Sequence, residues 1–198
     1  MASRLSVWVS GSGSNLERIV EASRNGEIPA SVVLVVSDRP GILALERAAK
    51  HSIPSAVISK KDYESEGAYA LALMELLKKH RVDLICLAGY LRKVPNEVVR
   101  AYSGRILNLH PALLPNYGGK GFFGRTVHEA VLAAKEKETG ATVHYVDEQY
   151  DHGSIILQKK IPVLPTDTPE TLAERVHQLE YEIYPEAIKL VLQKLARR

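Results

Sequence analysis

The chain has 198 residues, of which 45% are hydrophobic and 25% charged, and this composition excludes collagen-like, low-complexity and wholly disordered proteins. The formal charge of +3 comes from Lys and Arg residues that are spread along the chain, unlike the basic stripe of a nucleic-acid-binding protein. No stretch approaches the roughly 20 apolar residues of a membrane span, and the N-terminal segment lacks the apolar core of a signal peptide. We expect a cytoplasmic protein with one domain, residues 1–198, that binds neither nucleic acid nor membrane and is a monomer or a homodimer.

The predicted elements alternate between short apolar runs and longer amphipathic stretches. In chain order they are strand 5–10, helix 15–25, strand 31–37, helix 42–51, strand 56–58, helix 63–80, strand 82–88, helix 96–102, strand 105–109, helix 127–137, strands 140–146 and 155–164, and helix 168–195. Strands separated by helices predict an α/β fold whose mostly parallel, Rossmann-like sheet carries helices on both faces. The two late strands, with little helix between them, predict an antiparallel C-terminal extension.

The only cysteine, Cys86, lies in the apolar run VDLICLAG of the strand 82–88. It has no partner for an internal disulfide, and the run predicts that it is a small buried side chain. This fits a reducing compartment. A cysteine inside a strand is also poorly placed as a nucleophile, and no G-x-S-x-G elbow is present, so covalent catalysis is not expected.

A glycine-rich turn, residues 11–15 (GSGSN), connects the first strand to the first helix. Glycines allow backbone N–H groups to approach an anion, and the N-terminus of the helix adds partial positive charge. The turn is not a dinucleotide fingerprint, because Leu16 stands where the third glycine belongs, and it is not a P-loop. The pattern favours an anion site, with a plain turn capped by Ser14 or Asn15 as the alternative.

The strand 105–109 ends in the sequence NLHPALLP, residues 108–115. Because side chains alternate along a strand, Asn108 and His110 share a face near the carboxyl end of the sheet, where open α/β folds bind ligands. An amide and an imidazole side by side can donate hydrogen bonds to an oxyanion. The alternative is that both are structural. The following segment, 110–126, is long and rich in Pro and Gly, which is typical of a binding loop.

A third polar cluster, DEQYDHG at residues 147–153, lies between the two late strands. Its carboxylates and histidine fit either an acid/base site or a polar turn. The other histidines show no metal-ligand spacing with one another or with Cys86, so no metal site is expected.

Together these motifs resemble the phosphoribosylglycinamide formyltransferase family over nearly the whole chain. The resemblance is carried by SGSGSN, LAGYLRKVP, GRILNLHPALLP, TVHYVDEQYDHGSIILQ and EYEIYP. It implies transfer of a formyl group from 10-formyltetrahydrofolate to glycinamide ribonucleotide in purine biosynthesis, without metal. It also implies that Asn108, His110 and Asp151 form the catalytic trio: the first two stabilise an oxyanion, and Asp151 relays the proton of the amine. Thr142 is expected to orient Asp151.

The resemblance assigns two further groups of binding residues. The phosphate and ribose of the ribonucleotide fall to Ser12, Gly13, Ser14, Asn15, His177 and Glu180. The folate falls to Leu91, Arg92, Val94, Asp147 and Asp151. Arg92 is suited to a carboxylate of the glutamate tail. The chain departs from the family pattern in its longer 118–124 loop, which contains Lys120, and at Glu66, where an arginine is expected.

Two alternatives predict different behaviour. A formyltetrahydrofolate deformylase would use water in place of the amine, but it usually carries an N-terminal regulatory domain, which we do not expect in 198 residues. A non-catalytic nucleotide-binding module would bind a phosphate ligand without turnover.

Overall fold

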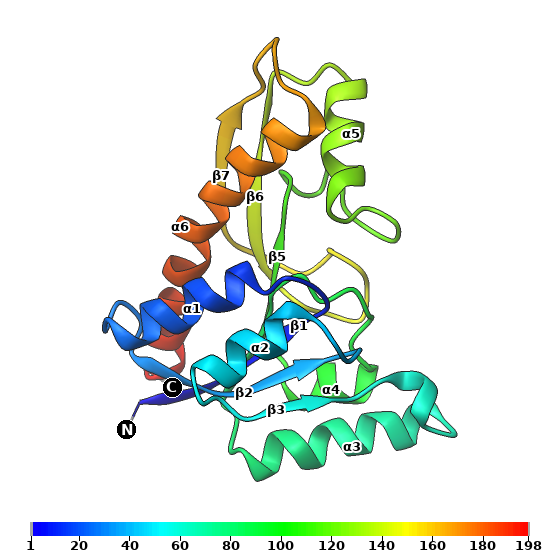
Figure 1. Ribbon diagram of the computed structural model, residues 1–198, viewed down its shortest axis with the longest axis vertical. Coiled ribbons are helices and arrows are strands. Elements are labelled where there is room, and N and C mark those ends of the chain that lie inside the picture. Colours follow the sequence, from blue (N-terminus) through cyan, green and yellow to red (C-terminus); the bar gives the residue numbers. More distant parts are fainter. Residues whose placement is uncertain (1, 198) are drawn as a thin grey trace.

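A seven-stranded sheet forms the centre of the molecule, in the order β3-β2-β1-β4-β5-β6-β7 (Figure 1). The computed structural model describes residues 2–197. The strands are β1 (Ser3–Val9), β2 (Ala30–Ser37), β3 (Ser55–Val57), β4 (Leu84–Leu87), β5 (Ile106–His110), β6 (Glu138–Tyr145) and β7 (Ile155–Pro162). The first five are parallel, and β6 and β7 join by antiparallel pairing. The predicted α/β fold, with a mostly parallel sheet and an antiparallel C-terminal extension, is therefore confirmed.

Helices cover both faces of this sheet, as predicted. They are α1 (Ser14–Arg24), α2 (Leu43–Lys50), α3 (Glu66–Lys79), α4 (Asn96–Ala101), α5 (Arg125–Ala133) and α6 (Pro169–Leu195). One apolar cluster packs α1, α2 and α6 on the sheet, and a second packs α3 and α4 on the opposite face (Figure 1). The last five residues of β1 and all of β4 are buried between these two layers, Cys86 among them. Within residues 2–197, no helix has the length and apolar character needed to cross a membrane.

The observed ends of three predicted helices show which local signals determine where a helix begins or ends. Thr168 caps α6: its hydroxyl accepts a hydrogen bond from Thr171 N–H, and Pro169 occupies the first turn, as the sequence indicates. Helix α3 begins later than residue 63, because the Ser65 side chain caps it and a short 3₁₀ turn, η1 (Lys60–Asp62), precedes it. Helix α5 ends before residue 137, because Lys135 adopts a positive φ of 54° and β6 already begins at Glu138.

The strand order brings three connecting segments to one edge of the sheet. The chain leaves β1 for β2 on one side and returns to the other side of β1 at β4. The segments that follow β1, β4 and β5 therefore meet at the carboxyl ends of the parallel strands, where open α/β sheets bind ligands. These segments begin at Ser10, Ala88 and Pro111.

The close approach of β6 to its partner strand leads to a stability prediction at Gly140. A Cβ there would overlap the carbonyl oxygen of Lys159 and lie 2.7 Å from Leu113 Cδ2. We expect Gly140→Ala to lower the free energy of unfolding by about 3 kcal/mol, measured by urea denaturation. Gly67, inside α3, has only Ser65 Oγ at 3.9 Å from such a Cβ, so Gly67→Ala is the matched control and should be stabilising by about 0.5–1 kcal/mol. Equal stabilities of the two variants would contradict the prediction.

Candidate active site

A pocket of about 710 Å³ opens at the carboxyl edge of the sheet. Most of the residues predicted to bind or react line it: Asn15, Leu91, Arg92, Val94, Asn108, His110, Asp147, Asp151, His177 and Glu180. They come from segments that are far apart in the sequence and meet only in the folded chain. Ser12, Gly13, Ser14 and Thr142 are not among the lining residues. Two of them lie next to the pocket: Ser14 contacts His177, which lines it, and Thr142 contacts the loop after β5.

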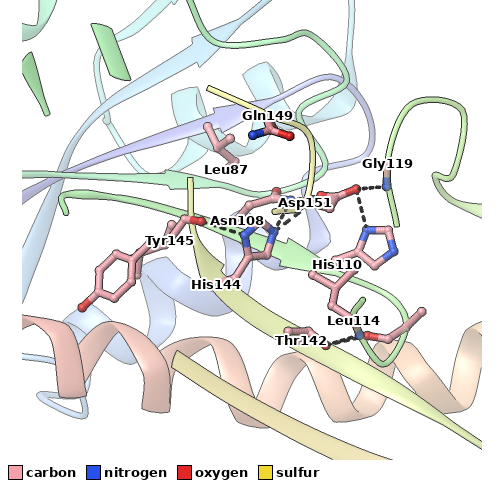
Figure 2. A network of polar contacts seen from close by, with 12 residues as sticks. Leu87, Asn108, His110, Leu114, Gly119, Thr142, His144, Tyr145, Gln149 and Asp151 are labelled. Carbon is pink, nitrogen blue, oxygen red and sulfur yellow. Dashed lines mark hydrogen bonds and ion pairs between the residues drawn. The ribbon is translucent and has the colours of Figure 1, made fainter. Parts of the chain in front are cut away.

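Asn108 lies at the centre of a partly buried polar network (Figure 2). Its Nδ2 is 3.1 Å from His144 Nε2 and donates to Asp151 Oδ1, also at 3.1 Å. The other ring nitrogen of His144, Nδ1, lies 2.8 Å from the carbonyl oxygen of Tyr145 and so carries the proton in the neutral ring. In that neutral form Nε2 of His144 accepts one amide hydrogen of Asn108, and the other goes to Asp151 Oδ1. When the ring is protonated, Nε2–H faces Asp151 Oδ1 at 3.5 Å.

Asp151 is held as a carboxylate by the groups around it. Burial raises its pKa, but contact with His144, the charge of His110 and the backbone N–H of Gly119 outweigh burial and lower the pKa overall. Gly119 N–H donates to Oδ2 at 2.9 Å. The backbone of Asp151 has a positive φ of 52°, so the turn holds this residue in the left-handed region that non-glycine residues rarely adopt. Its carboxylate therefore faces Asn108, His110 and the loop.

His110 is nearly fully buried, and both of its ring nitrogens face oxygen atoms. Nε2 lies 2.7 Å from the carbonyl oxygen of Tyr117, and Nδ1 lies 3.5 Å from Asp151 Oδ2. Burial lowers the pKa of His110, whereas the Asp151 charge and the Tyr117 carbonyl oppose that shift only partly. The site thus disfavours the imidazolium in the resting protein but supplies it with two acceptors once it forms.

Thr142 has a different role from the one expected. Its hydroxyl donates to Ala112 O at 2.6 Å and accepts from Leu114 N–H at 3.2 Å and from Gln158 Nε2 at 2.8 Å. It therefore holds the start of the loop after β5, and no hydrogen bond in the described residues joins it to Asp151. The reason is register: Thr142 pairs with His110 on β5, whereas His144, two residues later on the same face of β6, pairs with Asn108. His144 is the residue that reaches Asp151.

His144 was not among the residues predicted for the site. The signal was present in the sequence, because alternation along the strand puts His144 on the face of Thr142. His128 on α5 was also missed; it is buried, lines the pocket, and its Nδ1 has no hydrogen-bond partner in the described chain. Burial lowers the pKa of His128.

The glycine-rich turn and α6 meet beside the part of the pocket that Asn15, His177 and Glu180 line. Ser14 Oγ lies 2.8 Å from His177 Nε2, and Asn15 Nδ2 donates to Glu180 Oε2 at 2.8 Å. Neither Ser14 nor Asn15 caps α1, because the N-cap is Gly13 in the left-handed conformation. The alternative of a plain cap is therefore wrong for these two side chains. Asn15 Oδ1 is buried and has no hydrogen-bond partner in the part of the chain that the structure describes.

Glu180 carries an unusual carboxyl group. Burial raises its pKa to about 7, and the hydrogen bond from Asn15 opposes that shift only partly. Because the folded pKa lies above the ordinary value of 4.5, the folded protein binds the extra proton, and its stability falls as the pH rises from about 4.5 to 7.

The titration of Glu180 predicts a pH-dependent difference in stability. We expect the stability of Glu180→Gln relative to the wild type to rise between about pH 4.5 and 7, because the amide needs no proton. The difference should reach about 3 kcal/mol by pH 8. Urea denaturation of both proteins at several pH values from 4 to 8 measures the difference. A difference that does not change with pH would contradict the assignment.

The wall predicted for the folate combines apolar and charged groups. Leu91 is 45% exposed and Val94 is buried. Arg92 Nε donates to Asp38 Oδ2 at 3.0 Å, so a ligand carboxylate would compete with Asp38 for this guanidinium. Asp147 accepts hydrogen bonds from Gln149 N–H and His152 Nδ1.

The two departures from the family pattern lie in different environments. Glu66 forms an ion pair with Lys60 and is not among the pocket-lining residues. Residues 119–124 line the pocket, and Gly119, Gly121 and Gly124 all have positive φ, a conformation that glycine adopts without strain. The loop containing Lys120 is therefore part of the pocket wall.

Comparisons with known proteins agree with this architecture. The family model described as formyl transferase matches residues 3–188. The chain is 42% identical over 189 residues to a Bacillus subtilis protein named phosphoribosylglycinamide formyltransferase, with 96% of this chain and 94% of that protein covered. It is 43% identical, with a TM-score of 0.90, to the crystal structure of glycinamide ribonucleotide transformylase 1 from Geobacillus kaustophilus, with 97% of this chain and 100% of that chain covered.

A longer relative contains the same region. The chain is 45% identical over 191 residues to the trifunctional purine biosynthetic protein adenosine-3 of Drosophila melanogaster. The match covers 96% of this chain but only 14% of that protein. The chain thus corresponds to one part of the trifunctional relatives and to nearly all of the bacterial ones.

Proposed function

The chain belongs to the formyl transferase family, and from this premise we propose that it is a phosphoribosylglycinamide formyltransferase of purine biosynthesis. The proposed reaction transfers the formyl group of 10-formyltetrahydrofolate to the amine of glycinamide ribonucleotide, with residues 1–198 acting as a single formyltransferase domain. The observation that carries the proposal is the partly buried network of Asn108, His110 and Asp151 on a pocket of about 710 Å³.

Asn108 and His110 are proposed to stabilise negative charge on the formyl oxygen as the amine attacks the formyl carbon, with Asn108 turning one amide hydrogen from its acceptor in the ligand-free protein to that oxygen. Each donor of this kind contributes about 2.7–4 kcal/mol to lowering a barrier. His110 Nε2 is bonded to the carbonyl oxygen of Tyr117 in the ligand-free protein. We propose that the developing oxyanion replaces that carbonyl as acceptor. In the ligand-free protein the Tyr117 carbonyl oxygen thus occupies the position that the oxyanion takes during the reaction.

Asp151 is proposed to have two functions. Its charge, 3.5 Å from His110 Nδ1, favours the imidazolium against the opposing effect of burial. Because its lowered pKa keeps it ionised, it also accepts the proton of the attacking amine through water, and it returns that proton to the folate nitrogen as the bond from this nitrogen to the formyl carbon breaks. His144 keeps Asn108 and Asp151 in place, because its Nε2 contacts both.

The two walls of the pocket suit the two proposed substrates. The donors of Ser12, Gly13, Ser14 and Asn15 would hold the phosphate, and His177 and Glu180 would contact the ribose hydroxyls. On the other wall, Leu91, Val94 and Asp147 would contact the pterin, and Arg92 would bind the glutamate tail. With its pKa raised to about 7, Glu180 is protonated in about half of the molecules at neutral pH. This neutral form supports the assignment, because a buried neutral carboxyl group both donates to and accepts from a hydroxyl.

A steady-state assay with glycinamide ribonucleotide and 10-formyltetrahydrofolate, following the deformylated folate by absorbance, tests the proposal. Turnover is expected only when the ribonucleotide is present. Turnover without the ribonucleotide would identify a deformylase, with water in place of the amine. Binding of the ribonucleotide without any turnover would identify a non-catalytic nucleotide-binding module. Either outcome would overturn the proposed function.

A further inference from the structure

The turn after β1 has its carbonyl oxygens bound by neighbouring protein groups. Gly11 O accepts from Ala44 N–H at 3.3 Å, Ser12 O accepts from Arg47 Nε at 3.0 Å, and Gly13 O accepts from Glu17 N–H at 3.0 Å. Two of these three donors belong to α2 and the third to α1. The three backbone carbonyl groups of residues 11–13 are therefore directed towards a helix.

The donors of the same turn are left without partners. Between residues 2 and 197, no hydrogen bond uses the backbone N–H of Ser12, Gly13, Ser14 or Asn15. Asn15, in the first turn of α1, also lines the pocket. A run of free N–H groups at a helix N-terminus, with the carbonyl groups turned away, is the arrangement that binds an anion.

Among residues 2–197, Arg47 is the one side chain that binds a carbonyl of this turn, and it is itself held in place. Its Nη1 donates to Glu17 Oε2 at 2.9 Å, and the other oxygen of Glu17 lies 2.5 Å from His51 Nε2. Burial raises the pKa of Glu17, but the bonds to His51 and Arg47 outweigh it and lower the pKa. Glu17 is thus a carboxylate that orients the guanidinium towards Ser12 O.

Close packing keeps α2 against the turn. A Cβ at Gly13 would lie 2.6 Å from Ala44 Cβ, so only glycine allows the helix to approach this closely. Gly13 also has a positive φ of 73°. The backbone of the turn, Ala44 and Arg47 therefore form one rigid unit.

We propose that Arg47, held by Glu17 and His51, is a positioning residue for recognition of the substrate phosphate. Arg47 binds the Ser12 carbonyl and so keeps an acceptor out of a site that must present only donors. It is not among the residues that line the pocket. This inference rests on the proposed function for the identity of the substrate, but the donor-only turn is read from the geometry alone.

Arg47→Met tests the inference, because methionine keeps an unbranched apolar stem and removes every donor. We expect the KM for glycinamide ribonucleotide and the Ki of inorganic phosphate to rise about five- to tenfold, the effect of losing one hydrogen bond. The kcat and the KM for the formyl donor should stay within about twofold, because the chemical centre is untouched. Arg47→Lys, which keeps the charge and one donor, should recover part of the loss.

Arg24→Met is the matched control. Arg24 Nη2 also donates to a backbone carbonyl, that of His51, at 3.0 Å, but it does not contact the turn. The proposal would be overturned if the ribonucleotide KM rose equally in Arg47→Met and Arg24→Met. It would also be overturned if Arg47→Met lowered kcat and raised both KM values by the same factor, because that would mean a general structural role.

Calorimetric titration with inorganic phosphate separates this inference from the proposed function. If the wild type shows no turnover but binds phosphate, and Arg47→Met binds it more weakly while Arg24→Met does not, the inference stands and the proposed function fails. If turnover is present and phosphate affinity is the same in all three proteins, the inference fails alone.

Discussion

His110→Ala is expected to lower kcat by roughly 10²–10³-fold, with the KM of either substrate changed little. The imidazole is buried at the pocket, and its Nε2 contacts only a loop carbonyl that the oxyanion can replace. Its hydrogen bond therefore gains strength in the transition state and contributes little to ground-state binding. Single-turnover and steady-state rates with both substrates measure the effect.

His80→Ala is the control for this experiment. His80 ends α3, far from the pocket lining, and removal of its side chain should leave kcat within about twofold. If His110→Ala kept more than about a tenth of the wild-type kcat, His110 would not be a principal oxyanion donor.

Asp151→Asn is expected to lower kcat by about 10²–10⁴-fold, while the KM for the ribonucleotide stays within about twofold. The amide keeps the shape of the side chain but accepts no proton and carries no charge. The loss therefore falls on the proton relay and on the support of charged His110, not on binding of the phosphate or the ribose. Asp62→Asn, on the exposed turn η1, is the control and should behave like the wild type.

The same variant moves the titration of His110. Burial lowers the pKa of His110, and the Asp151 charge opposes that effect. Removal of the charge should therefore lower the pKa of His110 further, so that the imidazolium is lost at a lower pH than in the wild type. Nuclear magnetic resonance of the His110 ring protons against pH measures this directly. An unchanged or raised pKa would show that Asp151 does not support the imidazolium.

Local patterns in the sequence predicted most of the architecture. Residues 34–37 of β2 and the apolar run of β4 are buried on both faces, as such runs require when helices cover both sides of a parallel sheet. Thr168, which caps α6, and Gly26, which follows the C-cap of α1, are short-range signals whose physical cause lies within a few residues. The placement of Asn108 and His110 on one face of β5 is also a short-range signal, because a pleated strand presents every second side chain to the same face.

The tertiary structure alone decided which polar groups meet and what charge they carry. The antiparallel register of β5 and β6 puts His144, and not Thr142, beside Asn108, and one position of slip would reverse the faces. The raised pKa of Glu180 and the lowered pKa of His110 come from desolvation by segments distant in the chain. The free donors of the turn after β1 likewise depend on α2 binding its carbonyls. Sequence periodicity reports which face of an element is buried, whereas register, desolvation and hydrogen-bond direction are set by the groups on the other side of each contact.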